Sequence, residues 1–345
     1  MTGVIIGADI GGTSTRVGVA ELSGRFLAVV RGGPANPNAV GERPAIAEIR
    51  RVADAAVRQA VARSGGPVRA TGVVLGLAGV TGLADPASFG LATLPEALRD
   101  PSPGADAAAP PVSVVTDLEV AYASGTPEPD GSVLIAGTGA MAGAIRANVM
   151  VDRRDGWGWL LGDDGSGFWL GRQAVRATLA ELERGGPPGP LARAVLAATG
   201  AVPGPAGEVA DPAATAGALI RHSYARAPRE LSEYAPLVTR LATDDPAAAA
   251  IVDRAADRLV RTLAGLDPEP GRPIVVAGSL LLSGPTGATP VGARLREVLA
   301  ERLDNPLTEA GPGVAGAAWL ALPERSGADP RLHARLVGSA RAETG

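Results

Sequence analysis

A glycine-rich turn near the start of the chain has the residue types that bind phosphate. An apolar run from Val4 leads to Asp9, and Gly11, Gly12 and Thr13 follow before the next apolar run begins. Two adjacent glycines leave backbone N–H groups accessible to phosphate oxygens, because no Cβ stands in the way. A carboxylate beside such a turn can orient a hydrated Mg²⁺ ion against the same phosphates. The turn therefore predicts a phosphate site, with Asp9 as the residue that serves the metal.

The same pattern occurs a second time in the middle of the chain. An apolar run from Ser132 to Ala136 leads into Gly137, Thr138 and Gly139, and another apolar run follows. Two copies of strand, phosphate-type turn and strand indicate an internal duplication. We expect both turns to hold the phosphates of one nucleotide in a cleft between the two halves. Taken singly, either turn could be an ordinary hairpin, in which glycine and aspartate are common.

Missing residue types exclude several kinds of nucleotide and metal chemistry. The chain of 345 residues contains no cysteine, no lysine, and two histidines, His222 and His333. Without cysteine there is no disulfide, thiolate nucleophile, Cys-ligated zinc or iron–sulfur cluster. Without lysine there is no Walker-type P-loop. Phosphate binding must therefore depend on backbone amides, hydroxyls, arginine and Mg²⁺. Both histidines are expected on the surface or on a helix face, and no function is predicted for them.

Length and charge indicate a soluble protein of two domains. A chain of 345 residues exceeds the usual size of one hydrophobic core. The net charge is −4, with acidic and basic residues interspersed, so we expect no nucleic-acid partner. The N-terminus has no charged region followed by an apolar one, and we expect no membrane span, so a cytoplasmic location is predicted.

The order of the predicted elements indicates an α/β fold with a mixed sheet. After the first hairpin we expect a strand at 26–31, an amphipathic helix at 44–63, and strands at 73–77 and 112–115. Strands first and strand–helix alternation afterwards imply both antiparallel neighbours and parallel crossovers. Asp117 follows the last of these strands, so a carboxylate is expected at the edge of this sheet.

The second half is predicted to be richer in helix. Helices are expected at 165–183, 246–266 and 291–303, with a helical insertion up to about residue 241, and two Ala-rich helices near 314–322 and 330–341. A strand at 274–276 runs into Gly278 and Ser279, a turn that could accept an adenosine, although strand–glycine–helix is also common packing. We expect an N-terminal lobe at 1–118 and a C-terminal lobe at 119–345, whose last helix could pack back on the first lobe.

Together these motifs resemble the actin-like ATPase superfamily, also called the sugar kinase/Hsp70/actin fold. The sharper signal is the segment 155–171, which reads Asp-Gly-Trp-Gly-Trp-Leu-Leu-Gly-Asp-Asp-Gly-Ser-Gly-Phe-Trp-Leu-Gly. It is similar to the Gly-Trp-Gly and Gly-Asp-Glu-Gly-Ser segment of N-acetylglucosamine kinases in the BadF/BadG/BcrA/BcrD group. The resemblance covers roughly residues 4–320. It implies a two-lobed, ribonuclease H-like α/β fold with mixed sheets flanked by helices and a ligand cleft between the lobes.

The resemblance also implies a role for each matching residue. Asp117 would be the general base that accepts the proton of the sugar 6-hydroxyl. The sugar would further contact Asn36, Gly156, Trp157 and Asp163. The phosphates of ATP would be held by Gly11, Gly12, Thr13, Thr138 and Gly139, and its adenosine would lie against Gly278 and Ser279.

The implied activity is ATP- and Mg²⁺-dependent phosphorylation of the 6-hydroxyl of an amino sugar, with N-acetylglucosamine favoured. Glucosamine, N-acetylmuramic acid or another hexose are alternatives, because specificity depends on a few hydrogen bonds around the 2-substituent. An alternative of another class is a non-catalytic sugar or nucleotide sensor on the same fold; the presence of Asp117 favours catalysis. A homodimer is also implied.

The sequence departs from the group's usual pattern at several positions. Ala136 and Ala140 stand where serines are usual, Asp155 replaces a glycine, Asp164 stands where glutamate is common, and Ser14 replaces a basic residue. The identity of the sugar is the prediction that these changes weaken most.

Several candidate residues also have a purely structural interpretation. Asp117 and Asp163 could each cap the helix that follows. Trp157 and Trp159 could be core aromatics, since burial is usual for tryptophan. Asn36, flanked by prolines, could simply shape a turn.

Overall fold

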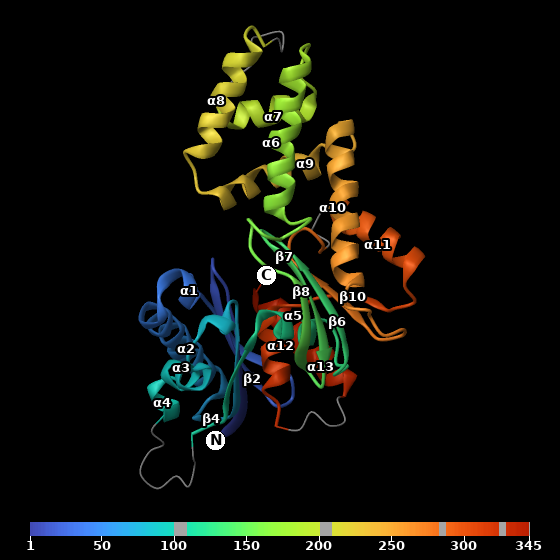
Figure 1. The fold of residues 1–345 in the computed structure, drawn as a ribbon. Helices are drawn as coiled ribbons and strands as arrows, with labels where there is room; N and C mark the ends of the chain where they lie inside the picture. The colour runs from blue at the N-terminus through green and yellow to red at the C-terminus, as the bar shows by residue number, and fades with distance from the viewer. Residues whose placement is uncertain (100–108, 201–208, 283–287, 324–328, 345) are drawn as a thin grey trace. The chain divides into compact units, whose positions relative to one another are not determined.

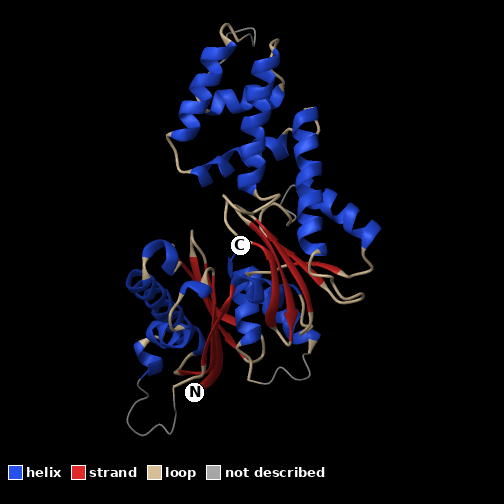
Figure 2. Cartoon of the chain, viewed as in Figure 1, coloured by secondary structure: helices blue, strands red, loops and turns tan. Residues whose placement is uncertain are grey.

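Two five-stranded sheets organise the computed structural model, and both have the same strand order (Figures 1 and 2). The first sheet runs β3-β2-β1-β4-β5, and the second runs β10-β9-β6-β7-β8. If the strands of the second sheet are renumbered 1 to 5 in chain order, the sheet runs 5-4-1-2-3. This is the order of the first sheet, 3-2-1-4-5, read from the opposite edge. This repeated topology confirms the predicted duplication and the α/β fold with mixed sheets.

The structure describes residues 1–99, 109–200, 209–282, 288–323 and 329–344. It divides into two units. The first unit contains Met1–Gly131, Ile145–Val151 and Thr308–Gly345, and the second contains Ser132–Ala144 and Asp152–Leu307. The sequence placed a boundary after residue 118 and allowed the last helix to pack back on the first lobe. In this division the first unit also includes 119–131, 145–151 and the whole segment from Thr308.

The first sheet combines a hairpin meander with two parallel crossovers. Its strands are β1 (Thr2–Ile10), β2 (Thr15–Glu21), β3 (Phe26–Gly32), β4 (Val68–Leu77) and β5 (Val112–Thr116). β2 lies antiparallel to β1 and β3, whereas β1, β4 and β5 are parallel. Parallel neighbours end at the same edge of a sheet, and this edge carries the polar residues that follow β1 and β5.

Helices cover both faces of the first sheet. One face packs against α2 (Glu42–Ser64) and α3 (Pro86–Thr93). The other face packs against α5 (Asp117–Gly125), α12 (Gly313–Leu320) and α13 (Pro330–Thr344). A Cβ on Gly7 of β1 would lie 2.4 Å from the backbone nitrogen of Ala318, so β1 and α12 pack backbone against backbone. The short helices α1 (Pro37–Val40) and α4 (Glu96–Arg99) and the 3₁₀ turn at Val80–Gly82 complete the unit.

The last helix is held to the first unit by a buried histidine. His333 of α13 is 7% exposed, its Nε2 lies 2.8 Å from the carbonyl oxygen of Ala123, and its ring stands edge-on to Trp319 at 5.0 Å. Of the two expected positions, a helix face is confirmed for His333 and an exposed surface is wrong. The cause is tertiary, because α13 turns this face onto α5 and α12.

The second sheet leads into the large helical part of the second unit. The sheet contains β6 (Gly131–Ala136), β7 (Ala140–Arg146), β8 (Val149–Asp155), β9 (Ile274–Ala277) and β10 (Leu307–Glu309). Its core continues into α6 (Gly167–Arg184), α10 (Pro246–Ala264) and α11 (Pro290–Arg302). Between α6 and α10 the described chain is helical, as predicted, in α7 (Pro190–Ala198), α8 (Pro212–Tyr224), the 3₁₀ segment Pro228–Tyr234 and α9 (Ala235–Arg240) (Figure 1).

Among the described residues, none of the helices combines the length and apolar character that crossing a bilayer requires.

Candidate functional site

The first glycine-rich loop joins β1 to β2 and exposes backbone donors. The N–H of Gly11 donates to the carbonyl of Ser14 at 3.0 Å, which closes the turn. Within the described residues, no partner is found for the N–H groups of Gly12 and Thr13. Neither glycine has a positive φ, and a Cβ on Gly12 would meet nothing within 4 Å. The turn itself does not require glycine at position 12, so what the missing Cβ provides is open access to the backbone.

The second loop, between β6 and β7, is closed in the same way. The N–H of Gly137 donates to the carbonyl of Gly139 at 2.9 Å. The first N–H groups of α6, from Gly167 and Phe168, donate to the carbonyls of Gly137 and Thr138 at 2.7 and 3.1 Å. These bonds hold the loop's peptide planes in place. For the N–H groups of Thr138 and Gly139 the described part of the chain offers no partner.

Two carboxylates lie at one edge of the first sheet. Asp9 pairs in register with Gly76 of β4, which pairs with Val115 of β5, and Asp117 comes two residues later. The cap of α5 is Thr116, whose hydroxyl accepts from the N–H of Glu119 at 3.2 Å. The capping interpretation of Asp117 was therefore wrong: Asp117 is the first helical residue.

Burial makes both carboxylates more basic, and the charge of Asp9 adds to the effect at Asp117. Burial raises the pKa of Asp9, and the guanidinium of Arg16, 4.0 Å away, offsets part of this rise. Burial also raises the pKa of Asp117; the N–H of Leu118, 3.1 Å from its Oδ1, lowers it, and the charge of Asp9 raises it further. A carboxylate with a raised pKa accepts a proton more readily, which suits a general base.

Asn36 occupies a turn in the first unit. Its side-chain oxygen accepts from the N–H of Asn38 at 2.9 Å, which caps the short helix α1. The side chain of Asn38 in turn donates to the carbonyl of Gly79 at 3.0 Å. The turn-shaping interpretation of Asn36 is confirmed, and among the described residues its side-chain NH₂ has no hydrogen-bond partner.

The segment 155–165 is an unusually tight loop of the second unit. Five of its eleven residues have positive φ, namely Asp155, Gly156, Gly158, Asp163 and Gly165. A Cβ on Gly156 would approach Met141 to 2.9 Å. Left-handed backbone is unfavourable for residues with a Cβ, so tertiary contacts must hold the two aspartates in it.

Asp163 is connected to the second glycine-rich loop. Its Oδ1 accepts from the N–H of Ala140 at 3.2 Å, and a Cβ on Gly139 would lie 3.0 Å from the same oxygen. Burial raises the pKa of Asp163, the bond from Ala140 lowers it, and the charge of Asp155 raises it. The cap of α6 is Ser166, so the capping interpretation of Asp163 was wrong.

The tryptophans of this loop face solvent. Trp157 is 58% exposed, with the guanidinium of Arg153 4.4 Å from its ring, and Trp159 is 40% exposed with its ring edge-on to Phe168. The core interpretation of both residues was wrong. Trp157 therefore presents an exposed aromatic ring in the same loop as Asp163.

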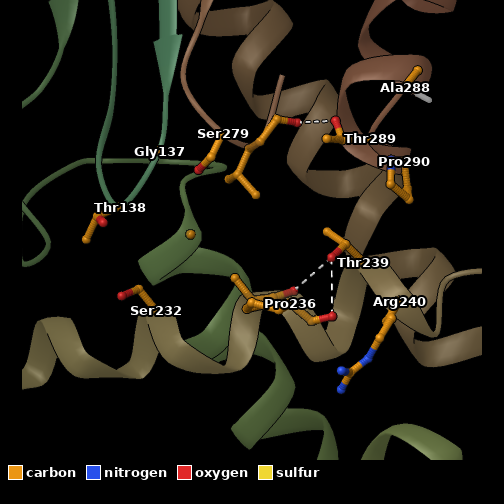
Figure 3. A pocket seen from close by; sticks show the side chains of 13 residues that line it. Gly137, Thr138, Ser232, Pro236, Thr239, Arg240, Ser279, Ala288, Thr289 and Pro290 are labelled. Carbon is orange, nitrogen blue, oxygen red and sulfur yellow. Dashed lines mark hydrogen bonds between the residues drawn. The ribbon is translucent and has the colours of Figure 1, made fainter. Parts of the chain in front are cut away.

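A pocket of about 440 Å³ in the second unit brings the second loop and the Ser279 turn together (Figure 3). Thr138 and Ser279 both line it. Gly278 is not a lining residue: its φ is 91°, and its Cα lies against the carbonyl of Ala136, where a Cβ would come within 2.2 Å. Gly278 therefore lets the turn pack on the end of β6.

Sequence reasoning missed the rest of the pocket's polar wall. Ser232, Thr239 and Arg240 come from the helical insertion. Thr289 caps α11 and donates from its hydroxyl to the carbonyl of Leu280 at 2.5 Å (Figure 3). The Thr-Pro pair at 289–290 signals a helix start. No local signal places the insertion beside the Ser279 turn.

The metal prediction can be tested against the donor set. The described residues contain no group of three His, Cys, Asp or Glu side chains that could hold a metal ion. Mg²⁺ with a nucleotide usually keeps several waters and binds through one or two carboxylates and the phosphates. Asp9 beside an open phosphate-type loop fits such a hydrated ion.

The fold and the two loops define a duplicated α/β protein with the actin-like fold that sugar kinases share. A model of the BadF/BadG/BcrA/BcrD ATPase family matches residues 6–283. This match spans most of the chain, which belongs to that family, as the motifs predicted.

Two curated proteins with named activities are similar to part of this chain. The chain is 26% identical over 183 residues to an N-acetylmuramic acid/N-acetylglucosamine kinase from Clostridium acetobutylicum, covering 53% of this chain and 55% of that protein. It is 29% identical over 201 residues to an N-acetyl-D-glucosamine kinase from Dictyostelium discoideum, covering 56% and 59%. The matches thus span little more than half the length of these curated relatives.

A solved structure is similar over nearly the whole chain. It is that of a proposed N-acetylglucosamine kinase from Chromobacterium violaceum, with a TM-score of 0.66 and 26% identity, covering 92% of this chain and 98% of that one. The similarity confirms the predicted fold class.

Proposed function

We propose that this protein transfers the terminal phosphate of ATP to the 6-hydroxyl of an amino sugar, with N-acetylglucosamine as the first candidate. The names of both curated relatives support an amino-sugar kinase. One of those names also includes N-acetylmuramic acid. Glucosamine and other hexoses remain alternatives for the acceptor.

The observation that carries the proposal is the placement of Asp117. Its carboxylate stands at the end of β5, on the edge that also holds Asp9 and the open first loop, and its pKa is raised. In our proposal it accepts the proton of the sugar hydroxyl as the oxygen attacks the γ-phosphorus. Phosphoryl transfer needs little else from the protein than positioning and charge neutralisation.

We assign phosphate binding to the backbone of the two glycine-rich loops. The N–H groups of Gly12, Thr13, Thr138 and Gly139, for which the described residues offer no partner, would bind phosphate oxygens, and Gly11 would shape the first loop. Ser279 would contact the adenosine, while Gly278 lets its turn approach β6. Asp9 would orient a hydrated Mg²⁺, which supplies charge neutralisation at the phosphates when bound.

The sugar is assigned to polar groups that retain bonding capacity. For Oδ2 of Asp163 and the NH₂ group of Asn36, the part of the chain that the structure describes offers no hydrogen-bond partner. Both could bond ring hydroxyls. The exposed Trp157 and its neighbour Gly156 would border the ring, because apolar ring faces pack on aromatic surfaces.

A coupled assay of ADP release tests the proposal. Purified protein is given Mg·ATP with N-acetylglucosamine, N-acetylmuramic acid, glucosamine, glucose or no sugar, and product position is read by NMR. We expect sugar-dependent ADP release with phosphate on the 6-oxygen. Sugar binding by calorimetry without ADP release would favour the non-catalytic sensor, and ADP release that no sugar stimulates would refute the kinase assignment.

Assembly and location are separate parts of the proposal. We propose a homodimer, which the resemblance implies, and a cytoplasmic location, which the sequence predicted on other grounds. Light scattering coupled to size exclusion, at several protein concentrations, would measure the oligomeric state.

A further inference from the structure

Asp155 holds the backbone of the loop that carries Asp163. Its Oδ1 accepts from the N–H of Asp163 at 2.7 Å, and its Oδ2 accepts from the N–H of Asp164 at 2.9 Å. Space for this carboxylate exists because residue 162 is glycine; a Cβ there would lie 2.1 Å from Oδ1 of Asp155. Both carboxylate oxygens are thus used to fix two consecutive peptide units.

The other end of this connection reaches the second glycine-rich loop. Asp163, with φ of 57°, turns its side chain to the N–H of Ala140. Asp164 is tied separately to α10, because its Oδ2 accepts from Arg258 at 2.5 Å, and the same guanidinium lies 5.2 Å from the ring of Trp169. The loop is therefore held at three points, and Asp155 supplies the bonds directly at Asp163.

Asp155 itself is in an unfavourable backbone conformation. Its φ is 61°, a region that glycine adopts freely and aspartate does not. Asp155 adopts this unfavourable conformation, and both of its carboxylate oxygens accept backbone N–H groups of one loop. Together these features indicate a positioning role.

We propose that Asp155 is a positioning residue that sets the carboxylate of Asp163 against the second phosphate loop, so that the sugar-binding group and the phosphate-binding backbone keep a fixed spacing. The proposal rests on the proposed function, because the ligand of Asp163 is the amino sugar assigned there. Asp155 acts through the Asp163 backbone and does not touch substrate.

The kinetic test compares matched Asp→Asn variants. Asp155→Asn keeps the shape but can accept only one of the two bonds, and loses their charge assistance. We expect the sugar KM to rise about tenfold, the scale of a lost hydrogen bond to a charged group, with a much smaller change in kcat. Asp211→Asn is the control: Asp211 also accepts a backbone N–H, from Ala214 at 2.9 Å, but does so at the exposed start of α8.

A double-mutant cycle separates positioning from general stability. In an Asp163→Ala background, Asp155→Asn should leave the sugar KM unchanged, because the group it positions is gone. Equal effects of Asp155→Asn in both backgrounds would overturn the proposal. Asp155→Gly, which relieves the left-handed strain, should raise the sugar KM even if the thermal midpoint does not fall.

Hydrogen–deuterium exchange tests the same claim without any substrate. We expect Asp155→Asn to accelerate exchange in peptides covering 161–165 and 138–141, and Asp163→Ala to accelerate the second peptide. Unchanged exchange in both peptides would refute the positioning role. If the wild-type protein phosphorylates no sugar, the proposed function fails, while the exchange result still decides whether Asp155 holds the Asp163 loop.

Discussion

The two glycine-rich loops share a backbone plan but differ in how carboxylates reach them. Each loop closes on the N–H of its first glycine, to Ser14 in one and to Gly139 in the other. In the first unit the acids stand at strand ends, where sheet register places Asp9 and Asp117. In the second unit the acid is Asp163, which comes from a left-handed loop beyond β8.

The difference shows two ways of placing a charge. A strand-end carboxylate takes its position from the ladder of backbone hydrogen bonds, so it needs no dedicated support. A loop carboxylate has no ladder, and here Asp155 and Arg258 anchor the segment that bears it. Substitutions in the first unit should therefore change chemistry with little change in structure, whereas those in the second should change geometry first.

The largest expected effect is at Asp117. Asp117→Asn should lower kcat about 10²- to 10⁴-fold, the usual contribution of a general base, with little change in the sugar KM. The fold should persist because Thr116 caps α5. Steady-state kinetics and thermal unfolding measure both. Asp85→Asn, at the exposed start of α3, should leave kcat unchanged; near-normal turnover by Asp117→Asn would exclude it as the base.

The next largest effect is at Asp9. Asp9→Asn should raise the Mg²⁺ concentration for half-maximal activity about 10- to 100-fold, the range for loss of a group that orients a metal's ligands. In metal-free protein it should also lower the pKa of Asp117, because a neighbouring negative charge is removed.

Carboxyl NMR titration checks the second part of this prediction. A second variant, Arg16→Gln, tests the pKa of Asp9 itself. Because Arg16 lowers this pKa, its removal should raise it. An Asp117 pKa that is the same with and without the Asp9 charge would show that the two carboxylates are not coupled.

A pair of glycine substitutions separates access from packing in the first unit. Gly12→Ala should leave thermal unfolding unchanged and raise the KM for ATP about tenfold or more, because its Cβ points into open space where phosphate would approach. Gly7→Ala should destabilise the fold by about 1–3 kcal/mol or more, because its Cβ would meet the backbone of α12. Loss of stability in Gly12→Ala would contradict the access argument.

The smallest effect concerns His333 and pH. Burial lowers its pKa from 6.5, although the bond to Ala123 partly offsets this. The unfolded chain therefore binds this proton more tightly than the folded chain does. The contribution of His333 to the free energy of unfolding is complete above about pH 6.5 and is lost as the pH falls through the lower pKa of the folded state. The raised pKa values of Asp9, Asp117 and Asp163 have the opposite effect. They lower the free energy of unfolding as the pH rises above about 3.8.

A variant isolates the histidine from these carboxyls. The unfolding free energy of His333→Gln should fall less between about pH 7 and 5 than that of the wild type, with a difference of about 1 kcal/mol for each pKa unit. Denaturant titrations at fixed pH give this comparison. Identical slopes would mean that the histidine titrates alike in folded and unfolded chains.

The sequence by itself determined the local elements and the two loops. Apolar runs ending in Gly-Gly-Thr and Gly-Thr-Gly predicted both hairpins, and helical periodicity predicted α2 and α10, because both signals depend on neighbours within a few residues. The mixed character of the sheet, the position of Asp117 after a strand and the family resemblance followed from the same patterns, whereas the strand order did not. Which side chain caps each helix did not follow from these patterns, since Thr116 and Ser166 stand close to aspartates of equal capping propensity.

Tertiary structure decided what distant segments do to one another. It buried His333, left Trp157 exposed, brought Ser232 and Arg240 of the helical insertion to the Ser279 pocket, and placed the carboxylate of Asp155 on the Asp163 backbone. Sequence spacing does not encode such contacts, because burial and hydrogen bonding there depend on which faces meet after the chain has folded.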